Sequence, residues 1–266
     1  MADSFLAHVL LSFAVGGIGV GSATYAARKY YSGIGGLIGG LPSISSISFF
    51  FIGLNQSSDA ASQATSAFPL GMSFTFLFLL IYTSLAEYGF KTAMTIGLVA
   101  WFSFSSVEAY IHLQNLVISL IAVSTIFTTS QYLFKHRFDL KYTKGAGEGL
   151  SAKKFAEFAI PGGAVVAGAV YFSQVLGTTA GGVSAAFPAI FSLTLTFTYL
   201  SEGGMNLSRS MTKPLMIAAY TAALPYSVLV GLLYPIQGLY LGTLVAAVAD
   251  LPFVFLAYFL IHERRI

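Results

Sequence analysis

The segment Gly33-Ile-Gly-Gly-Leu-Ile-Gly-Gly-Leu-Pro42 occurs a second time, 146 positions later, as Thr179-Ala-Gly-Gly-Val-Ser-Ala-Ala-Phe-Pro188. The double glycine and the proline align in the two copies. The same shift aligns residues 14–111 with residues 160–257 without a gap, and identical pairs include Gly16/Gly162, Tyr25/Tyr171, Ser46/Ser192 and Thr75/Thr221. Because internal repeats decide architecture, we predict two copies of one unit that place two Gly-Pro segments against each other.

The composition is that of a membrane protein. Hydrophobic residues make up 56% of the chain, charged residues make up 9%, and the mean hydropathy is +0.79. In soluble domains about a quarter of the residues are charged, whereas runs of about 20 apolar residues span a bilayer. The net charge of +3 is no sign of nucleic-acid binding, because the basic residues lie between the apolar runs. The absence of cysteine excludes disulfides, thiol catalysis and thiolate metal sites.

The apolar runs predict nine transmembrane spans. The first is interpreted as a membrane span and not as a cleaved signal. The spans cover about residues 5–27, 33–54, 67–86, 92–112, 115–134, 156–176, 178–200, 214–234 and 238–261. When the intervening breaks alternate across the membrane, all 13 Lys and Arg residues fall on one face. Cytoplasmic loops collect Lys and Arg, so we predict an outside N-terminus and an inside C-terminus.

Repeat and topology together predict an inverted architecture. Spans 1–4 and spans 6–9 are copies that cross the membrane in opposite directions, and span 5 is the extra helix. We therefore expect an all-α protein with a 4+1+4 inverted-topology repeat. Its parts are a first repeat (1–112), a connecting helix with a basic linker (113–155) and a second repeat (156–266). Such repeats are typical of secondary transporters; a duplicated packing unit is the alternative interpretation.

The two prolines indicate a candidate transport site. Each lies near the middle of its span, and a proline removes a hydrogen bond from the helix. Gly/Pro-interrupted spans at matching positions of two halves point to a transport site. The glycines before the prolines are interpreted as close-packing residues, and the hydroxyl groups after them as candidates to line a path. The candidate substrate-binding residues are Pro42, Ser43, Ser45, Ser46, Pro188, Ser192, Thr194, Asp250 and Tyr226.

Two carboxyl groups fall inside the predicted spans. A charge at bilayer depth is costly, so an intramembrane carboxylate is a functional hypothesis by default. Asp250, near the centre of the last span, is the main candidate for binding a coupling ion; a structural hydrogen bond to a neighbouring helix is the alternative. Glu108 is a second coupling candidate, but its place toward the outer end of its span favours simple exposure at the interface. Their repeat counterparts, Phe104 and Val254, are apolar.

Other motifs carry little chemistry. Glu202 and Arg209 follow span 7 and are candidate gate residues, with an ordinary solvated loop as the alternative. The four histidines are scattered without metal-ligand spacing, and neither a phosphate loop nor a hydrolase motif is present. The sequence therefore predicts no enzyme, no metal site and no cofactor.

The second half resembles a known family. Gly181-Gly182, Phe187-Pro188, the segment from Glu202 to Arg209 and Pro225-Tyr226 are similar to marks of the GlpM-like (DUF3147-like) small membrane proteins. Those proteins look like single four-span units. The likeness covers spans 6–9 and requires small gaps near Arg209 and before Pro225, and the first half has diverged further. The resemblance implies that this chain is a fused, inverted form of such a unit, and it names no substrate.

These observations predict a secondary transporter of a small solute in a prokaryotic-type plasma membrane. The expected partners are the lipid bilayer, a small-molecule or ion substrate and a coupling proton or Na⁺. A homo-oligomer is compatible with the sequence, and no nucleic acid is expected. An ion channel on the same axis and a membrane scaffold without transport activity are the alternatives.

Overall fold

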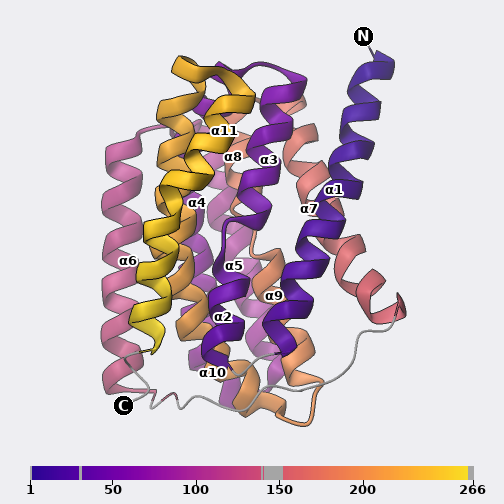
Figure 1. Cartoon of the computed structure of the whole chain (residues 1–266). Helices are drawn as coiled ribbons and strands as arrows, with labels where there is room; N and C mark the ends of the chain where they lie inside the picture. The colour runs from indigo at the N-terminus through magenta and orange to yellow at the C-terminus, as the bar shows by residue number, and fades with distance from the viewer. Residues whose placement is uncertain (1, 30–31, 139, 141–151, 263–266) are drawn as a thin grey trace.

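In a computed structural model of the chain, the fold is a bundle of helices (Figure 1). The structure describes residues 2–29, 32–138, 140 and 152–262. Across these residues no strand occurs, and eight helical stretches are long and apolar enough to cross a membrane. The prediction of an all-helical, membrane-embedded chain is therefore confirmed at that level.

The first half of the bundle begins with the long helix α1, which is followed by a broken helix and two further long helices. In order, they are α1 (Ala2–Lys29), α2 (Ser32–Gly40), α3 (Ser43–Asn55), α4 (Ser58–Leu85), the short turn η1 (Ala86–Tyr88) and α5 (Phe90–Ile111). The helix α6 (Leu116–His136) follows after a tight loop in which Asn115 caps its first turn.

The second half repeats this order. Its elements are α7 (Ala152–Leu176), α8 (Thr178–Ala185), α9 (Ala189–Tyr199), α10 (Gly204–Ala218), the π-helical turn η2 (Ala219–Ala223) and α11 (Leu224–His262). The starts of α8, α9 and α10 lie 146 positions after those of α2, α3 and α4. The shift found in the sequence is thus also the shift between helix boundaries.

Two helices begin earlier than predicted. The predicted third span starts at residue 67, whereas α4 starts at Ser58, where the Ser57 hydroxyl accepts a hydrogen bond from the Ala60 amide at 3.0 Å. The predicted eighth span starts at residue 214, whereas α10 starts at Gly204. Hydropathy marks only the apolar part of a helix. A capping residue followed by polar side chains extends the helix beyond that part.

The last helical stretch contains a reversal. Gly204–His262 forms one continuous run of 59 residues, but Gly238 has φ 74° and ψ −178°, which is not helical. Beyond this break, the Thr243 hydroxyl lies 2.7 Å from the Tyr234 hydroxyl. A straight helix would hold residues nine positions apart at about 13 Å, so the chain doubles back at Gly238.

Helices α1 and α7 cross closely through small residues. A methyl group added to Gly16 would lie 2.6 Å from Val166 Cβ, and one added to Gly162 would press on Val20 in the same way. The residue number rises along α1 as it falls along α7, so the two helices are antiparallel. Gly162 and Val166 are the repeat counterparts of Gly16 and Val20, so the two contacts exchange under the 146-residue shift. Self-complementary exchange of this kind is the property of a two-fold contact.

The core of the bundle is built around α4. The Ser62 hydroxyl donates to the Gly231 carbonyl at 2.6 Å, and the Tyr82 hydroxyl lies 2.7 Å from that of Ser208. The run from α10 into α11 is therefore antiparallel to α4. Most of α4 is buried, and its aromatic residues belong to one large apolar cluster. This buried pair of helices forms the wall behind the two helix breaks.

Candidate functional site

The two proline breaks have nearly the same backbone geometry. Pro42 has φ −73° and ψ 37°, and Pro188 has φ −75° and ψ 45°. A proline has no amide hydrogen to donate, so the residue that follows it bonds locally. The Ser43 amide donates to the Leu41 carbonyl at 2.7 Å, and Ala189, the counterpart of Ser43, makes the equivalent bond to Phe187 at 2.8 Å. Each break therefore separates two short helices.

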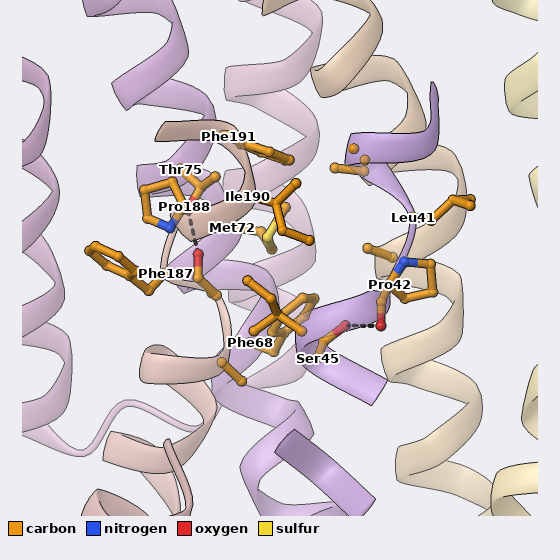
Figure 2. Close-up of a pocket in the computed structure, with 17 residues that line it drawn as sticks. Leu41, Pro42, Ser45, Phe68, Met72, Thr75, Phe187, Pro188, Ile190 and Phe191 are labelled. Atoms are coloured by element: carbon orange, nitrogen blue, oxygen red, sulfur yellow. Dashed lines mark hydrogen bonds between the residues drawn. The ribbon is translucent and has the colours of Figure 1, made fainter. Parts of the chain in front are cut away.

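A cavity lies between the two breaks (Figure 2). It has a volume of about 40 Å³. Pro42 and Pro188 face it from opposite sides, and Phe68, Met72 and Thr75 of α4 close it from behind. The residues that α2–α3 and α8–α9 contribute form six repeat-related pairs: Gly39/Ala185, Gly40/Ala186, Leu41/Phe187, Pro42/Pro188, Ile44/Ile190 and Ser45/Phe191.

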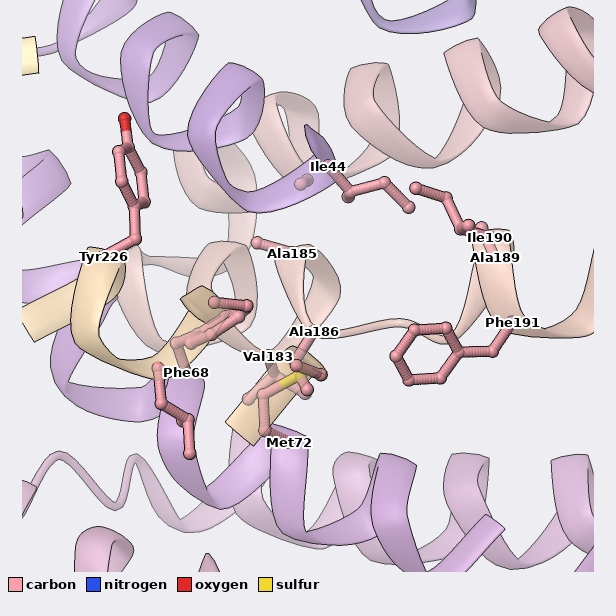
Figure 3. Close-up of a cluster of buried hydrophobic side chains, with 14 of the residues drawn as sticks. Ile44, Phe68, Met72, Val183, Ala185, Ala186, Ala189, Ile190, Phe191 and Tyr226 are labelled. Carbon is pink, nitrogen blue, oxygen red and sulfur yellow. The ribbon is translucent and has the colours of Figure 1, made fainter. Parts of the chain in front are cut away.

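The cavity lies where residues related by the 146-residue shift come together. Ile44 and Ile190 are counterparts, and their side chains point toward one another (Figure 3). Both are buried in the same apolar cluster. A residue can face its own counterpart only at the axis that relates the two copies. The cavity is therefore shared equally by both halves.

The lining of the cavity is mostly apolar. Its hydroxyl groups belong to Ser45, which bonds to the Pro42 carbonyl at 3.3 Å, and to Thr75. None of its 17 lining residues is charged. A cavity needs about 10–15 Å³ per water molecule, so this one has room for about three waters. Only a very small solute fits without further opening.

The second break is held by a hydrogen-bond relay that includes Trp101. The Thr75 hydroxyl donates to the Ala186 carbonyl at 2.6 Å and accepts from the Trp101 indole at 2.9 Å. The Trp101 ring also packs edge-on against Phe187, with 4.9 Å between ring centroids. Three helices, α4, α5 and α8, thus meet at the residues just before Pro188.

The first break has no such relay. Thr221, the counterpart of Thr75, donates to the Ile217 carbonyl within its own helix. The counterpart of Trp101 is Ala247. Instead, a methyl group on Gly36 would lie 2.6 Å from the ring of Pro214. Twelve of the 17 lining residues form repeat-related pairs, but the two breaks are attached differently to their surroundings.

The predicted substrate-binding residues divide into two groups. Pro42, Ser45 and Pro188 line the cavity. Ser43, Ser46, Ser192 and Thr194 do not, and the hydroxyls of Ser46 and Ser192 bond to backbone carbonyls of their own helices. The hydroxyl of Thr194 is buried without a partner on α9.

The two predicted coupling carboxyls lie away from the cavity. Asp250 is buried on the second arm of α11, with one oxygen lacking a partner, and Tyr226, another candidate, is buried on the first arm. Glu108 is 2% exposed and neither of its oxygens has a partner. The expectation that Glu108 is exposed at the interface is therefore wrong. The buried face of α5 carries it inward, because Glu108 shares that face with Trp101 and Ser105.

The candidate gate residues are separate. Glu202 is exposed in the loop after α9, while Arg209 lies on α10 with its guanidinium 5.6 Å from the centre of the Phe138 ring. No ion pair joins these two described side chains. In the part of the chain that the structure describes, no group of three His, Asp or Glu residues could hold a metal ion.

Sequence reasoning missed several residues of the cavity wall. Phe68, Met72, Thr75, Ala219 and Ala223 all line it from α4 and η2. The identity of Thr75 with its counterpart Thr221 was a usable signal. The π-helical turn η2 could not be predicted from the sequence, although such turns occur often at functional sites.

Comparison of the chain with protein-family models, with curated proteins and with solved structures gives no match. The function must therefore be argued from the site itself.

Proposed function

We propose that the protein is a secondary transporter of a small solute, which binds between the two proline breaks. The observation that carries this proposal is the cavity at Pro42 and Pro188, lined by six repeat-related pairs of residues. In transporters built from inverted repeats, substrate sites form at the repeat interface from broken helices. Rocking of one unit against the other would then open the cavity to each face in turn.

The contacts between the two halves support an inverted repeat. Helices α1 and α7 are antiparallel, and their contacts exchange under the 146-residue shift. The reversal at Gly238 divides the last long stretch into two arms. With this division the chain would cross the membrane nine times, as a 4+1+4 arrangement with the N-terminus outside. A GlpM-like unit, fused and inverted, remains our proposal for its origin, and the prokaryotic-type plasma membrane our proposal for its location.

The cavity favours a small uncharged substrate. Its volume of about 40 Å³ is far below the several hundred Å³ of a drug-sized binding site. Its lining offers hydroxyls and apolar side chains but no charge. An ion would lose its hydration shell there without compensation, which disfavours the ion-channel alternative. Asp250 does not line the cavity, so in this proposal it serves in coupling and does not contact the substrate.

Single cysteines test this pathway directly, because the chain contains none. We propose Ser45→Cys as the probe of the cavity. Ser73→Cys is the matched control, since Ser73 is fully buried on α4, bonds to the Pro69 carbonyl and does not line the cavity. Each variant is reconstituted in vesicles and exposed to a small, charged, membrane-impermeant thiol reagent from one face at a time.

A transporter predicts that Ser45→Cys reacts from both faces while Ser73→Cys stays unreactive. A channel predicts the same labelling together with single-channel currents in planar bilayers. A scaffold predicts no labelling of Ser45→Cys from either face, and that result would reject the proposal. Substrates found by a thermal-shift screen of metabolites and ions are then tested for saturable uptake, which we expect to be lost in Asp250→Asn.

A further inference from the structure

A second polar group lies inside the bundle, outside the central cavity. Glu108 and Ser105 are 2% and 4% exposed, and neither side chain has a hydrogen-bond partner. They stand three positions apart on α5 and therefore share one face of the helix. Buried polar atoms in folded proteins are nearly always paired. Because two unpaired polar side chains, one of them a carboxyl group, are adjacent here, this face of α5 is a candidate binding site for a proton or a cation.

No cationic side chain faces this carboxyl group. The Trp101–Thr75 bond and the approach of Gly97 to Phe78 fix α5 antiparallel to α4. In that register Glu108 lies level with about residue 68 of α4. Tyr171 of α7 lies near this level, next to Phe172 of the crevice described below, but its ring is exposed and stacks on Phe5 of α1. The other titratable groups of the neighbouring helices lie near the ends of α4, on η1 and at the start of α7, and α8 has none. They are Asp59, Tyr82, Glu87, Tyr88, Lys153 and Glu157. On α5 and its loop, Lys91, Tyr110 and His112 are exposed.

A crevice on the side of α7 and α8 reaches Ser105, next to Glu108 on the same face of α5. It has a volume of about 180 Å³, and Ser105, Ala109 and Val183 are among its lining residues. At the end of α5, Gln114 bonds to the hydroxyls of Thr178 and Thr179 at 2.9 and 2.7 Å. The loop after α5 is thereby fixed to the start of α8, so the crevice is a built feature of the fold.

We propose that Glu108, which shares a buried face of α5 with Ser105, is a proton-binding site beside this crevice. An unpaired carboxylate is strongly unfavourable in such surroundings, whereas the neutral carboxylic acid brings no charge that has to be compensated. Metal cations of the hard type take a shell of several oxygen ligands, and no second carboxyl group faces this point. The repeat counterpart of Glu108 is Val254, so the second half has no carboxyl group at this position.

The same face of α5 connects this site to the central cavity. Trp101 lies two helical turns from Glu108, or about 10 Å along the axis, and it holds Thr75 against the Ala186 carbonyl. Gain or loss of the Glu108 proton changes the charge on α5, the helix whose Trp101 holds the second proline break. If the proposed transport function holds, on which this step rests, Glu108 binds a coupling proton in addition to the coupling role of Asp250.

The test is carbodiimide labelling of the full chain in lipid nanodiscs. Dicyclohexylcarbodiimide reacts with protonated carboxyl groups in apolar surroundings, and peptide mass spectrometry locates the adduct. We expect an adduct on Glu108 that declines as the pH rises and is unchanged by NaCl against choline chloride. The exposed Glu87 is the internal control and should stay unlabelled. Glu108→Gln should remove the adduct.

Two results would overturn the inference. One is a Glu108 that remains unmodified at every pH while the protein stays folded. The other is protection by NaCl, which would make this a sodium site. Carbodiimide labelling does not depend on transport activity. If Glu108 is not labelled, the result of the Ser45→Cys experiment is therefore unaffected. Conversely, a Ser45→Cys that never reacts would reject the transporter while the Glu108 adduct still establishes proton binding.

Discussion

At the residue scale, the glycines before each proline serve close packing. A methyl group added to Gly182 would collide with the backbone carbonyl of Ala64, and one added to Gly35 would collide with that of Ala27. Backbone atoms cannot move aside as a flexible side chain can. The interpretation of these glycines as packing residues is thus supported by what surrounds them.

We expect Gly182→Ala to destabilise the protein by about 1–3 kcal/mol, because overpacking in a tight core has that cost. Gly168→Ala is the matched control on α7, where a methyl group would meet only Phe172, at 3.7 Å. Alanine favours helix over glycine by about 1 kcal/mol, so the control should be neutral or stabilising. Thermal unfolding in detergent measures both. Equal melting temperatures for the two variants would contradict this account of the α8–α4 contact.

At the element scale, the second proline break depends on the relay through Thr75. We expect Thr75→Val to destabilise the protein by about 1–3 kcal/mol, since it leaves the buried Trp101 indole and the Ala186 carbonyl without their partner. Thr221→Val is the control, because that hydroxyl bonds only within its own helix. A double-mutant cycle with Trp101→Phe checks the origin of the loss. If the two substitutions are additive, the relay does not hold the break.

The sequence predicted the helix breaks but not their attachment. Pro42 and Pro188 interrupt their helices because proline has no amide hydrogen to donate, and this effect can be predicted from the sequence alone. The Trp101–Thr75 bond depends on how α5 lies along α4, and no spacing rule specifies that register. The same holds for Glu108. Its depth in the span was predicted, whereas its burial depends on which face of α5 turns inward.

At the scale of the whole molecule, composition was sufficient to predict a helical membrane protein, and the 146-residue shift predicted which helices correspond. The sequence could not predict that the side chains of Ile44 and Ile190 point toward one another (Figure 3), since a repeat specifies similarity and not contact. The polar starts of α4 and α10 were also missed, because polar helical turns carry no apolar signal. The starts of α4 and α10 lie 146 positions apart, so the repeat itself supports these two helix boundaries.

The orientation of the two halves gives the last prediction. Asp59 and Glu202 are exposed near the starts of α4 and α10, which are repeat-related helices. If the repeat is inverted, Asp59→Cys lies outside and Glu202→Cys inside. His112→Cys should share the face of Asp59→Cys, and Glu87→Cys that of Glu202→Cys, as same-face controls. A membrane-impermeant maleimide applied to intact cells should label only the outer pair, and a permeant maleimide all four. Labelling of Asp59→Cys and Glu202→Cys from the same face would mean that the two halves are parallel. The proposed two-fold axis in the membrane plane, between Ile44 and Ile190, would then be rejected.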